Sequence, residues 1–551
     1  MYYAVQNCVL ELSFHSGKSY KDPFNELEVD VLFEGANDSK RTVPAFWAGE
    51  NLWKVRFATP TPGRYTYTSV CSDKANMSLH QQKGEIEVGP YKGRNPLFKH
   101  GPLKVSGDHH YLEHYDGTPF FWLGDTWWLV LCKRLRWPKD IRTLTEDRVK
   151  KGFTVVQFFA GLPPETSPFS FDERVANEAG FPWEEGYTRI NPSYFDMADL
   201  RIEHMVDSGL LPCIYGLQGL YLPEMGVEKI KQYWRYLIAR YGAYPVVWCV
   251  AGEATSPFMF SKDKEKDREI QKKGWTEVTR YVREVDGGHN LITIGPPGCA
   301  ESRNEVEDAS LLDFDLLQTV HGDWTVIPLH IDTVLTAVKR EPRVPVVLGE
   351  VCYEGHGGCS GEIIQRFMFW SGILSGLCGH TYGADGLWQV NTRQKPYGNF
   401  ISGTTYTTTV WEDIYQSPSS SQLGMAKKLL QRYPWWQLEP HPEWIKSGWT
   451  HRAAWNRQED KYFTCFAAGI PKALRIIYFP TQRHAQPVLA GLEKDTQYDA
   501  FYYDPITGRE YPVGDVKPNQ QGEWTAPPFP IFQDGILVLE KKGNDFNQVE
   551  S

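Results

Sequence analysis

The chain lacks the features that mark a membrane protein, a nucleic-acid binder or a metalloprotein. Its 551 residues include no run of about 18 uninterrupted apolar residues, the length that a membrane-spanning helix needs. The net charge of -10 is spread without basic blocks, so the long-range attraction for phosphate that a nucleic-acid binder needs is missing. The ten cysteines form no CxxC pair and no Cys/His cluster at metal-ligand spacing. We therefore expect no membrane or nucleic-acid partner, no metal and no cofactor.

The N-terminus also lacks the pattern of a secretion signal. The stretch MYYAVQNCVLELSFHSGKSY has no basic first segment and no continuous apolar segment, and its alternation predicts a strand. We therefore expect a cytoplasmic protein with reduced core thiols. The sequence leaves a homo-oligomer open.

Aromatic side chains are abundant instead. The chain contains 20 Trp, 29 Tyr and 28 Phe, which together make up 14% of its residues. Flat aromatic faces pack against the C–H faces of sugar rings, but they also fill protein cores, so this content alone indicates carbohydrate only weakly. The length predicts two to four domains.

Changes in the apolar pattern divide the chain into three predicted domains. Residues 1–92 carry six short alternating runs separated by Pro and Gly, which is typical of a small antiparallel β-sandwich. In residues 93–430, which open on a predicted linker over 90–108, apolar strands alternate with helical stretches, as in βα units around a parallel sheet. Residues 431–551 are again β-rich, with a hairpin turn at DPITG. The predicted fold is α/β, with a central barrel between N-terminal and C-terminal β-sandwich domains.

Eight candidate strands lie in the central region, which is the number that closes a (β/α)8 TIM barrel. They span residues 119–125, 153–160, 210–217, 246–253, 290–295, 314–321, 344–350 and 376–382. Their ends, from Asp125 to His380, are on average about 36 residues apart, close to the repeat of a typical barrel of about 250 residues. A doubly wound open sheet is the competing fold, and the absence of a GxGxxG motif after any strand disfavours it.

Two carboxylates stand out at the strand ends, where the active site of a barrel lies. Glu253 ends VVWCVAGE and Glu350 ends VVLGE, and in each a glycine precedes the carboxylate and leaves room for a ligand. The fourth and seventh strands of an eight-stranded barrel face each other across its mouth. Glycoside hydrolysis requires such a pair, since one carboxyl protonates the leaving oxygen while the other attacks the anomeric carbon or activates water.

Other polar and aromatic side chains at the strand ends are predicted to contact the sugar. They are Asp125, Trp128, Gln157, Tyr215, His321, Tyr353, His356, His380 and Tyr382. Most of them would bind hydroxyl groups, whereas Trp128 and Tyr382 would stack on the ring. Glu354 is disfavoured as the attacking group because it lies in the glycine-rich loop after the seventh strand.

Each of these residues also has a structural interpretation. A single glutamate at a strand end more often forms a salt bridge or caps a helix, the histidines could be buried, and Asp125 could cap the segment after its strand. Asp, Glu and His at a barrel rim also describe metal hydrolases, but those usually carry His-x-His at the first strand, where this chain reads GDTWW. The pairing of two glutamates at opposite strands favours catalysis.

Four segments carry a resemblance to a known family: DGTPFFWLGDTWW, FTVVQFFAG, YPVVWCVAGE and VPVVLGE. They resemble the apiosidase-like glycoside hydrolases, the group around glycoside hydrolase family 140, within a broader clan of retaining (β/α)8 enzymes. The N-terminal region is similar to the immunoglobulin-like (Ig-like) module often placed before this barrel. The C-terminal region is similar to the β-sandwich that is named after collagen binding. The resemblance covers nearly the whole chain.

The resemblance implies that Glu253 is the general acid/base and Glu350 the nucleophile. Two departures limit what it implies about the substrate. The clan commonly has asparagine before the acid/base, where this chain has Gly252, and apiosidases carry aspartate at the acid/base position itself. The extra methylene of glutamate moves the proton donor outward, so apiose specificity does not follow.

The expected activity is that of a retaining, exo-acting glycosidase. Without a secretion signal, its expected substrates are oligosaccharides or glycosides small enough to be imported. Two alternatives stay open. One is a catalytically inactive carbohydrate-binding protein on the same scaffold. The other is an inverting glycosidase, whose carboxyl groups lie about 6.5–9.5 Å apart instead of about 5–5.5 Å.

Overall fold

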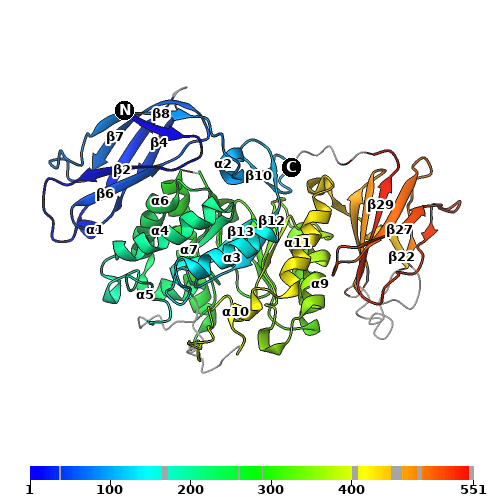
Figure 1. Cartoon of the computed structure of the whole chain (residues 1–551). Helices are drawn as coiled ribbons and strands as arrows, with labels where there is room; N and C mark the ends of the chain where they lie inside the picture. The colour runs from blue at the N-terminus through cyan, green and yellow to red at the C-terminus, as the bar shows by residue number, and fades with distance from the viewer. Residues whose placement is uncertain are drawn as a thin grey trace.

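A computed structural model describes most of the chain in three consecutive regions (Figure 1). The described residues are 1–35, 39–163, 172–257, 261–287, 289–399, 408–447, 462, 464–480, 487–544 and 546. An N-terminal pair of sheets lies at one end of the molecule, a helix-covered sheet in the middle and a C-terminal pair of sheets at the other end. Within the described residues, no helix combines the length and apolar character that crossing a membrane requires.

The N-terminal region forms a five-stranded sheet in the order β1-β8-β7-β3-β4 and a three-stranded sheet in the order β2-β6-β5. Its elements are β1 (Tyr2–Val5), β2 (Leu10–His15), α1 (Pro23–Glu26), β3 (Val29–Glu34), β4 (Lys40–Pro44), β5 (Phe46–Trp47), β6 (Leu52–Phe57), β7 (Gly63–Cys71) and β8 (Lys83–Gly89). Alternation in β3 buries Val29, Val31 and Phe33 on one face. Phe33 stacks on Phe57 of the second sheet with ring centroids 4.2 Å apart, so the two sheets share one core.

The segment predicted as a linker is folded. Asn95 accepts a hydrogen bond from the backbone N–H of Leu97 and so caps α2 (Pro96–His100), which begins with proline. A three-stranded sheet follows, formed by β9 (Leu103–Val105), β10 (Leu112–His114) and β11 (Pro119–Phe120). The prediction treated Pro and Gly as signs of a linker, whereas here they begin and end short elements.

The central region is a curled nine-stranded sheet covered by helices, a mixed α/β arrangement of TIM-like form. Its eight parallel strands are β12 (Trp122–Thr126), β13 (Val155–Leu162), β14 (Leu211–Leu217), β15 (Val247–Cys249), β16 (Leu291–Thr293), β18 (Asp315–Gln318), β19 (Val346–Glu350) and β20 (Gly379–Tyr382). Each predicted strand overlaps one of them, so their number and order are confirmed. The ninth, β17 (Ala300–Glu301), pairs antiparallel with β18.

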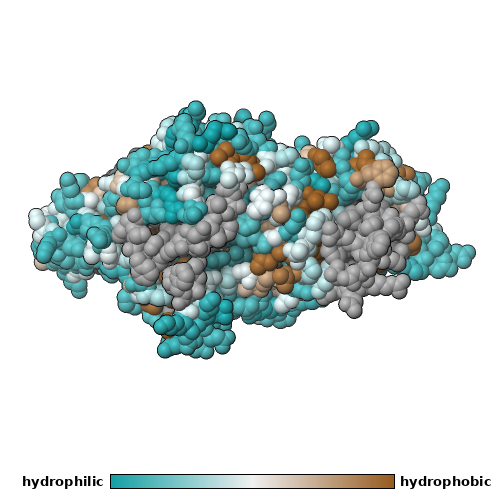
Figure 2. All heavy atoms as spheres, turned by 90° about the horizontal axis from the view of Figure 1, so that it is seen from below, coloured by the Kyte–Doolittle hydropathy of each residue, from teal (hydrophilic) through white to brown (hydrophobic). Residues whose placement is uncertain are grey.

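Helices follow most of the strands, as expected for βα units. They are α3 (Lys139–Lys150), α4 (Pro192–Asp207), α5 (Leu222–Met225), α6 (Val227–Tyr241), α7 (Lys264–Asp286), α8 (Ile327–Lys339), α9 (Glu362–Ile373), α10 (Trp411–Ile414) and α11 (Pro418–Leu430). The short helices α5 and α10 lie at the lower end of the molecule in Figure 1, and Figure 2 views the surface from that side. That surface is mostly hydrophilic, with hydrophobic residues in small separate patches.

The two outer parallel strands, β16 and β18, approach each other without forming a ladder. The N–H of Asp313 donates to the carbonyl of Ile292 at 2.9 Å. The hydroxyl of Ser302 lies between two carbonyls, 2.5 Å from that of Ile294 and 3.0 Å from that of Leu316. These contacts satisfy backbone groups that a closed ladder would otherwise pair.

The C-terminal region forms a six-stranded sheet in the order β21-β23-β24-β29-β26-β27 and a three-stranded sheet in the order β22-β25-β28. Its strands are β21 (Glu439–Pro440), β22 (Ile445–Ser447), β23 (Phe466–Ile470), β24 (Leu474–Phe479), β25 (Val488–Leu489), β26 (Tyr498–Tyr503), β27 (Glu510–Asp515), β28 (Trp524–Thr525) and β29 (Gly535–Lys541). DPITG connects the antiparallel strands β26 and β27, so the predicted hairpin is confirmed.

Buried ion pairs join the terminal regions to the central one. Arg56 of β6 bonds Asp199 of α4 at 2.5 Å. At the other end, Arg366 of α9 forms two parallel hydrogen bonds with Asp534, of 2.8 and 2.7 Å, and Tyr478 also donates to Asp534. Asp534 is fully buried, so the carboxylate depends on these donors.

We expect Asp534→Asn to lower the free energy of unfolding by about 3–5 kcal/mol, because it removes the buried carboxylate that neutralises Arg366. A second acidic partner of Arg366, Glu362, is 3.6 Å away and its side chain is 41% exposed. Urea denaturation followed by tryptophan fluorescence measures this loss. The control is Asp413→Asn, which breaks an ion pair with Arg393 whose side chains are 62% and 64% exposed. That variant should lose less than about 1 kcal/mol. Equal losses in both variants would contradict the assignment.

Candidate active site

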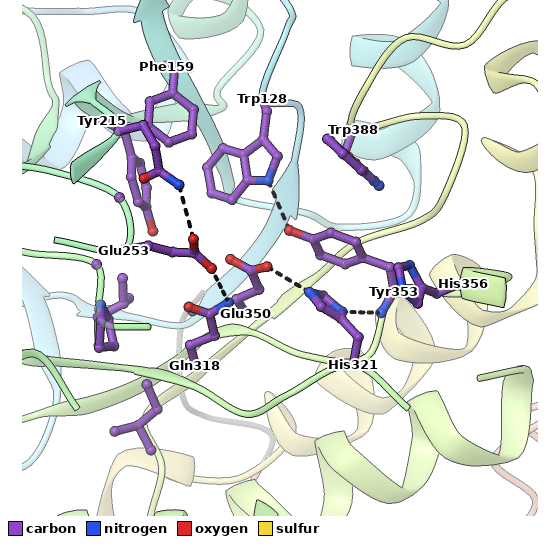
Figure 3. A pocket seen from close by; sticks show the side chains of 17 residues that line it. Trp128, Phe159, Tyr215, Glu253, Gln318, His321, Glu350, Tyr353, His356 and Trp388 are labelled. Atoms are coloured by element: carbon purple, nitrogen blue, oxygen red, sulfur yellow. Dashed lines mark hydrogen bonds and ion pairs between the residues drawn. The ribbon is translucent and has the colours of Figure 1, made fainter. Parts of the chain in front are cut away.

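A pocket of about 210 Å³ lies where the carboxyl ends of the parallel strands meet (Figure 3). Glu350, the last residue of β19, and Glu253, four residues beyond β15, both line it, and their side chains point toward one another. The amides of Gln218 and Gln318 and the imidazole of His321 lie beside them. The two carboxyl groups therefore lie in one cavity, where the charge of one affects the protonation of the other.

Glu350 is held by the strand that carries it. Gly349 precedes it, and a Cβ at that position would lie 2.4 Å from the side chain of Leu316, so only glycine fits against the neighbouring strand. The buried amide of Gln157 donates to the carbonyl of Gly349 at 2.8 Å. The carbonyl of Glu350 itself accepts from the N–H of Thr319 at 3.0 Å. The backbone around Glu350 is thus fixed on both sides.

His321 binds the carboxylate of Glu350 through a defined ring nitrogen. The backbone N–H of Tyr353 points at Nδ1 of His321 at 3.4 Å, and because an N–H can only donate, Nδ1 accepts. The proton of the neutral ring is therefore on Nε2, which donates to Glu350 Oε1 at 3.0 Å. Burial lowers the pKa of His321, but the hydrogen bond and the negative charge of Glu350 outweigh it, and the net pKa lies above its ordinary value.

Glu253 sits on a strained backbone with a φ of +45°, which L-residues other than Asn and Asp rarely adopt. Nε2 of Gln218 donates to one carboxylate oxygen at 3.1 Å, and Nε2 of Gln318 donates to the other at 3.2 Å. Burial and then the negative charge of Glu350 raise the pKa of Glu253, while the two amides act in the opposite sense. Of the two pocket glutamates, Glu253 is therefore the one whose surroundings favour the protonated form.

Aromatic rings form one wall of the pocket. Trp128, Phe159 and Tyr215 lie with ring centroids 4.8 to 5.3 Å apart. The indole N–H of Trp128 donates to the hydroxyl of Tyr353 at 2.9 Å and so ties this wall to the loop after β19. A Cβ at Gly252 would lie 2.5 Å from the ring of Phe159, so the ring occupies the space that a side chain before Glu253 would need.

The pocket brings together seven of the residues predicted from the sequence. They are Glu253, Glu350, Trp128, Tyr215, His321, Tyr353 and His356. His356 stacks near His321 with ring centroids 4.9 Å apart, and its Nδ1 lies 3.2 Å from the buried carboxylate of Asp385. The glycine-rich loop after β19 therefore folds onto the site.

The structure corrects the prediction for four other residues, which do not line this pocket: Asp125, Gln157, His380 and Tyr382. Asp125 is fully buried and pairs with Arg148 of α3 at 2.5 Å. Gln157 lies deeper on β13 and holds the backbone before Glu350. Both are supporting residues without access to a ligand in the pocket.

The remaining two corrected residues, His380 and Tyr382, face the helices that cover the sheet. His380 packs against Phe369 of α9, and burial lowers its pKa to about 3, so the ring is neutral. Tyr382 donates to Glu354, and the guanidinium of Arg148 lies over its ring at 5.7 Å. Their predicted contacts with a sugar are therefore not supported by this placement.

Ten lining residues were missing from the predicted site, and three of them carry side chains that can form hydrogen bonds. Gln218 follows β14, Gln318 ends β18, and Trp388 lies in the connection after β20. Gln318 could have been found from its position, because it is a polar residue near the end of a predicted strand, where the active site of a barrel lies. Trp388 carries no such signal, since it lies six residues beyond its strand.

The arrangement suits proton transfer to a bound group together with attack from the opposite side. One carboxyl has a raised pKa, and the other accepts a hydrogen bond from an imidazole N–H. In the part of the chain that the structure describes, no group of three or more His, Cys, Asp or Glu side chains could hold a metal ion.

Comparison with solved structures finds folds of the same kind. A glycoside hydrolase family 5 protein from Bacteroides vulgatus ATCC 8482 matches with a TM-score of 0.67 at 20% identity, covering 83% of this chain and 96% of its own. A second protein of that organism also has a TM-score of 0.67, at 18% identity, and covers 98% of this chain and all of its own. A further glycoside hydrolase has a TM-score of 0.66 at 22% identity and covers 83% of this chain. At these identities, the likeness concerns the fold.

Two segments of the chain match known family models. Residues 6–72 match a domain of unknown function, DUF5060, and residues 106–437 match the family described as apiosidase-like, catalytic domain. No curated protein matches the chain significantly. The second match spans more than half of the sequence and contains both pocket glutamates. The chain therefore belongs to the apiosidase-like catalytic domain family.

Proposed function

We propose that the protein is a retaining glycoside hydrolase in which Glu350 is the nucleophile and Glu253 the general acid/base. The observation that carries this proposal is the unequal environment of two carboxyls in one pocket. Glu253 has a raised pKa, whereas Glu350 is bound by the N–H of His321. A proton donor and an ionised nucleophile are the two groups that the retaining mechanism needs.

In the first step, the carboxylate of Glu350 attacks the anomeric carbon while Glu253 gives its proton to the glycosidic oxygen. The bond to the leaving group breaks, and a neutral alcohol departs. In the second step, Glu253, now a carboxylate, takes a proton from water, and the water oxygen displaces Glu350. The imidazole of His321 orients Glu350 throughout, since its Nε2–H faces that carboxylate.

The size of the pocket supports exo-action on small oligosaccharides or glycosides. Its volume of about 210 Å³ lies below the range of about 300–1,000 Å³ that is common for drug-sized ligands. Trp128, Phe159 and Tyr215 close one side and offer apolar faces to a sugar ring. A single terminal sugar is the substrate portion that fits this space.

We further infer that the curled sheet acts as a (β/α)8 barrel, residues 93–430, between β-sandwich domains at residues 1–92 and 431–551. The circular order of the eight parallel strands supports the barrel. The shared aromatic core of the two N-terminal sheets supports the first sandwich. A barrel would place the ends of β15 and β19 across one mouth, as the two glutamates require.

Glu350→Gly should abolish hydrolysis of aryl glycosides, with kcat falling by about a thousand-fold or more, because the group that forms the covalent bond is gone. Azide or formate should restore part of the rate by entering the vacated space. Glu354→Gln is the matched control, because this nearby glutamate is buried and absent from the pocket lining. Glutamine keeps an acceptor oxygen for Tyr382 or Ser419, and the backbone hydrogen bonds of residue 354 are unchanged. Unimpaired turnover in Glu350→Gly would refute the assignment.

Glu253→Gln should separate substrates by their leaving groups. Glycosides with poor leaving groups should lose about 10²–10⁴-fold in kcat/KM, because their oxygen needs a proton, and activated aryl glycosides should lose far less. In the unsubstituted enzyme, kcat/KM should fall as the pH rises through the raised pKa of Glu253, since the proton donor is then lost. Equal losses on both substrate types would speak against an acid/base role.

The stereochemistry of the product tests the retaining mechanism directly. We expect the first sugar released from an aryl glycoside to keep the anomeric configuration of the substrate, because two displacements restore it. Proton NMR during the first minutes of turnover distinguishes the anomers before they interconvert. Release of the opposite anomer would identify an inverting enzyme and exclude a glycosyl–Glu350 intermediate.

A further inference from the structure

The two oxygens of Glu253 differ in their surroundings, although both face a glutamine amide. Gln218, directly after β14, donates to Oε2 at 3.1 Å, and Gln318, at the end of β18, donates to Oε1 at 3.2 Å. The two glutamines come from opposite sides of β15 and line the pocket together with Glu253. Figure 3 shows Gln318 beside Glu253. The difference is that a backbone N–H fixes the amide of Gln218.

Gln218 has a fixed orientation. Its own Oε1 accepts a hydrogen bond from the backbone N–H of Gly219 at 3.0 Å. Because a backbone N–H can only donate, the oxygen of the Gln218 amide must face Gly219, and its NH2 group must face Glu253. Gly219 is held in place, since its N–H also donates to the carbonyl of Gly252 at 2.7 Å. A Cβ added at Gly219 would lie 2.4 Å from the carbonyl oxygen of Glu253, so the two backbones are close.

This fixed donor restricts where Glu253 can carry a proton. Oε2 faces an N–H of Gln218 in every protonation state. A proton on Oε2 would have to turn away from that N–H, and the hydroxyl oxygen would accept the fixed hydrogen bond only weakly. A carboxylic acid with its proton on Oε1 keeps Oε2 as a full acceptor of that hydrogen bond. The hydroxyl formed at Oε1 can still accept weakly from Gln318 while directing its own proton elsewhere.

We propose that Glu253 delivers its proton from Oε1, the oxygen beside Gln318, and that Gln218 is the positioning residue that keeps Oε2 unprotonated. The proposal rests on the function proposed above and specifies its first step. The proton leaves Oε1 for the glycosidic oxygen as the bond from the anomeric carbon to that oxygen breaks and the bond to Glu350 forms. The alcohol leaves neutral, and Glu253 remains as a carboxylate bonded by both amides.

The charges around Glu253 agree with this role for the amides. Glu350 faces it from β19 and His321 from the connection after β18, while the hydroxyls of Tyr215 and Tyr353 lie in the same pocket. Burial and Glu350 raise the pKa of Glu253, and the hydrogen bonds from the two glutamines lower it. Removing either amide donor should therefore raise this pKa further.

The test compares Gln218→Met with Gln318→Met, two substitutions of similar shape that each remove one donor to Glu253. In both variants, the alkaline limb of kcat/KM should move to higher pH by about one unit, because the carboxylate loses a hydrogen bond. Only Gln218→Met should also lose about ten-fold more kcat/KM on poor than on good leaving groups, because the proton can then settle on Oε2. Gln318→Met should keep the leaving-group ratio of the unsubstituted enzyme.

Two further variants separate this effect from general damage to the site. Gln157→Met removes the amide that holds the backbone before Glu350, so it should slow both substrate types equally and leave the alkaline limb in place. Gln218→Glu keeps the oxygen that accepts from Gly219 but adds a negative charge beside Glu253. Its alkaline limb should move by more than that of Gln218→Met, and it serves as the test should Gln218→Met not fold.

An unchanged pH profile and leaving-group ratio in the Gln218 variants would overturn the proposal. A leaving-group effect confined to Gln318→Met would overturn it as well, because the proton would then leave from Oε2. Failure of the proposed function gives a different result, since Glu253→Gln would then show no dependence on the leaving group. The two failures are thus distinguishable within one set of measurements.

Discussion

Glu253 and Glu350 face each other in one pocket, and two negative charges so placed would repel each other. The side chains around them resolve this repulsion unequally. His321 gives a hydrogen bond to Glu350, whereas burial and then the negative charge of Glu350 raise the pKa of Glu253. The amides of Gln218 and Gln318 limit that rise, so Glu253 can both hold a proton and release it.

The backbone conformation of Glu253 brings its side chain toward Glu350. The left-handed conformation of Glu253 costs about 1–2 kcal/mol relative to an ordinary one and persists only where neighbours fix it. The N–H of Ala254 donates to Gly295 at 2.9 Å, and the N–H of Gly219 donates to Gly252 at 2.7 Å, so the segment is bound to both adjacent strands. Phe159 fills the space beside Gly252, and the site consequently has an aromatic ring where a polar side chain could otherwise reach the sugar.

Sequence reasoning located the strands and the glutamate pair because both depend on local signals. Apolar runs of the right spacing gave the order of the strands, and a glycine before each glutamate marked the close approach. The predicted sugar contacts of His380 and Tyr382 were wrong because successive side chains of a strand point to opposite faces of the sheet. An error of one position therefore moves a side chain from the interior of the curled sheet to the helix layer. On β20, Thr381 faces inward and accepts from Trp122, so its neighbours His380 and Tyr382 face outward. Gln157 was misplaced for another reason, because β13 continues to Leu162, two residues past the predicted end.

The outward residues form a layer on which the pocket depends. Asp125 neutralises the buried Arg148, whose guanidinium lies over the ring of Tyr382. Tyr382 and Ser419 of α11 both donate to Glu354, which fixes that carboxylate from the helix side. The backbone of Glu354 in turn pairs with Gly383 and Asp385. Since Tyr353 directly precedes Glu354, this layer holds the N–H that fixes the tautomer of His321 and, through it, the hydrogen bond to Glu350.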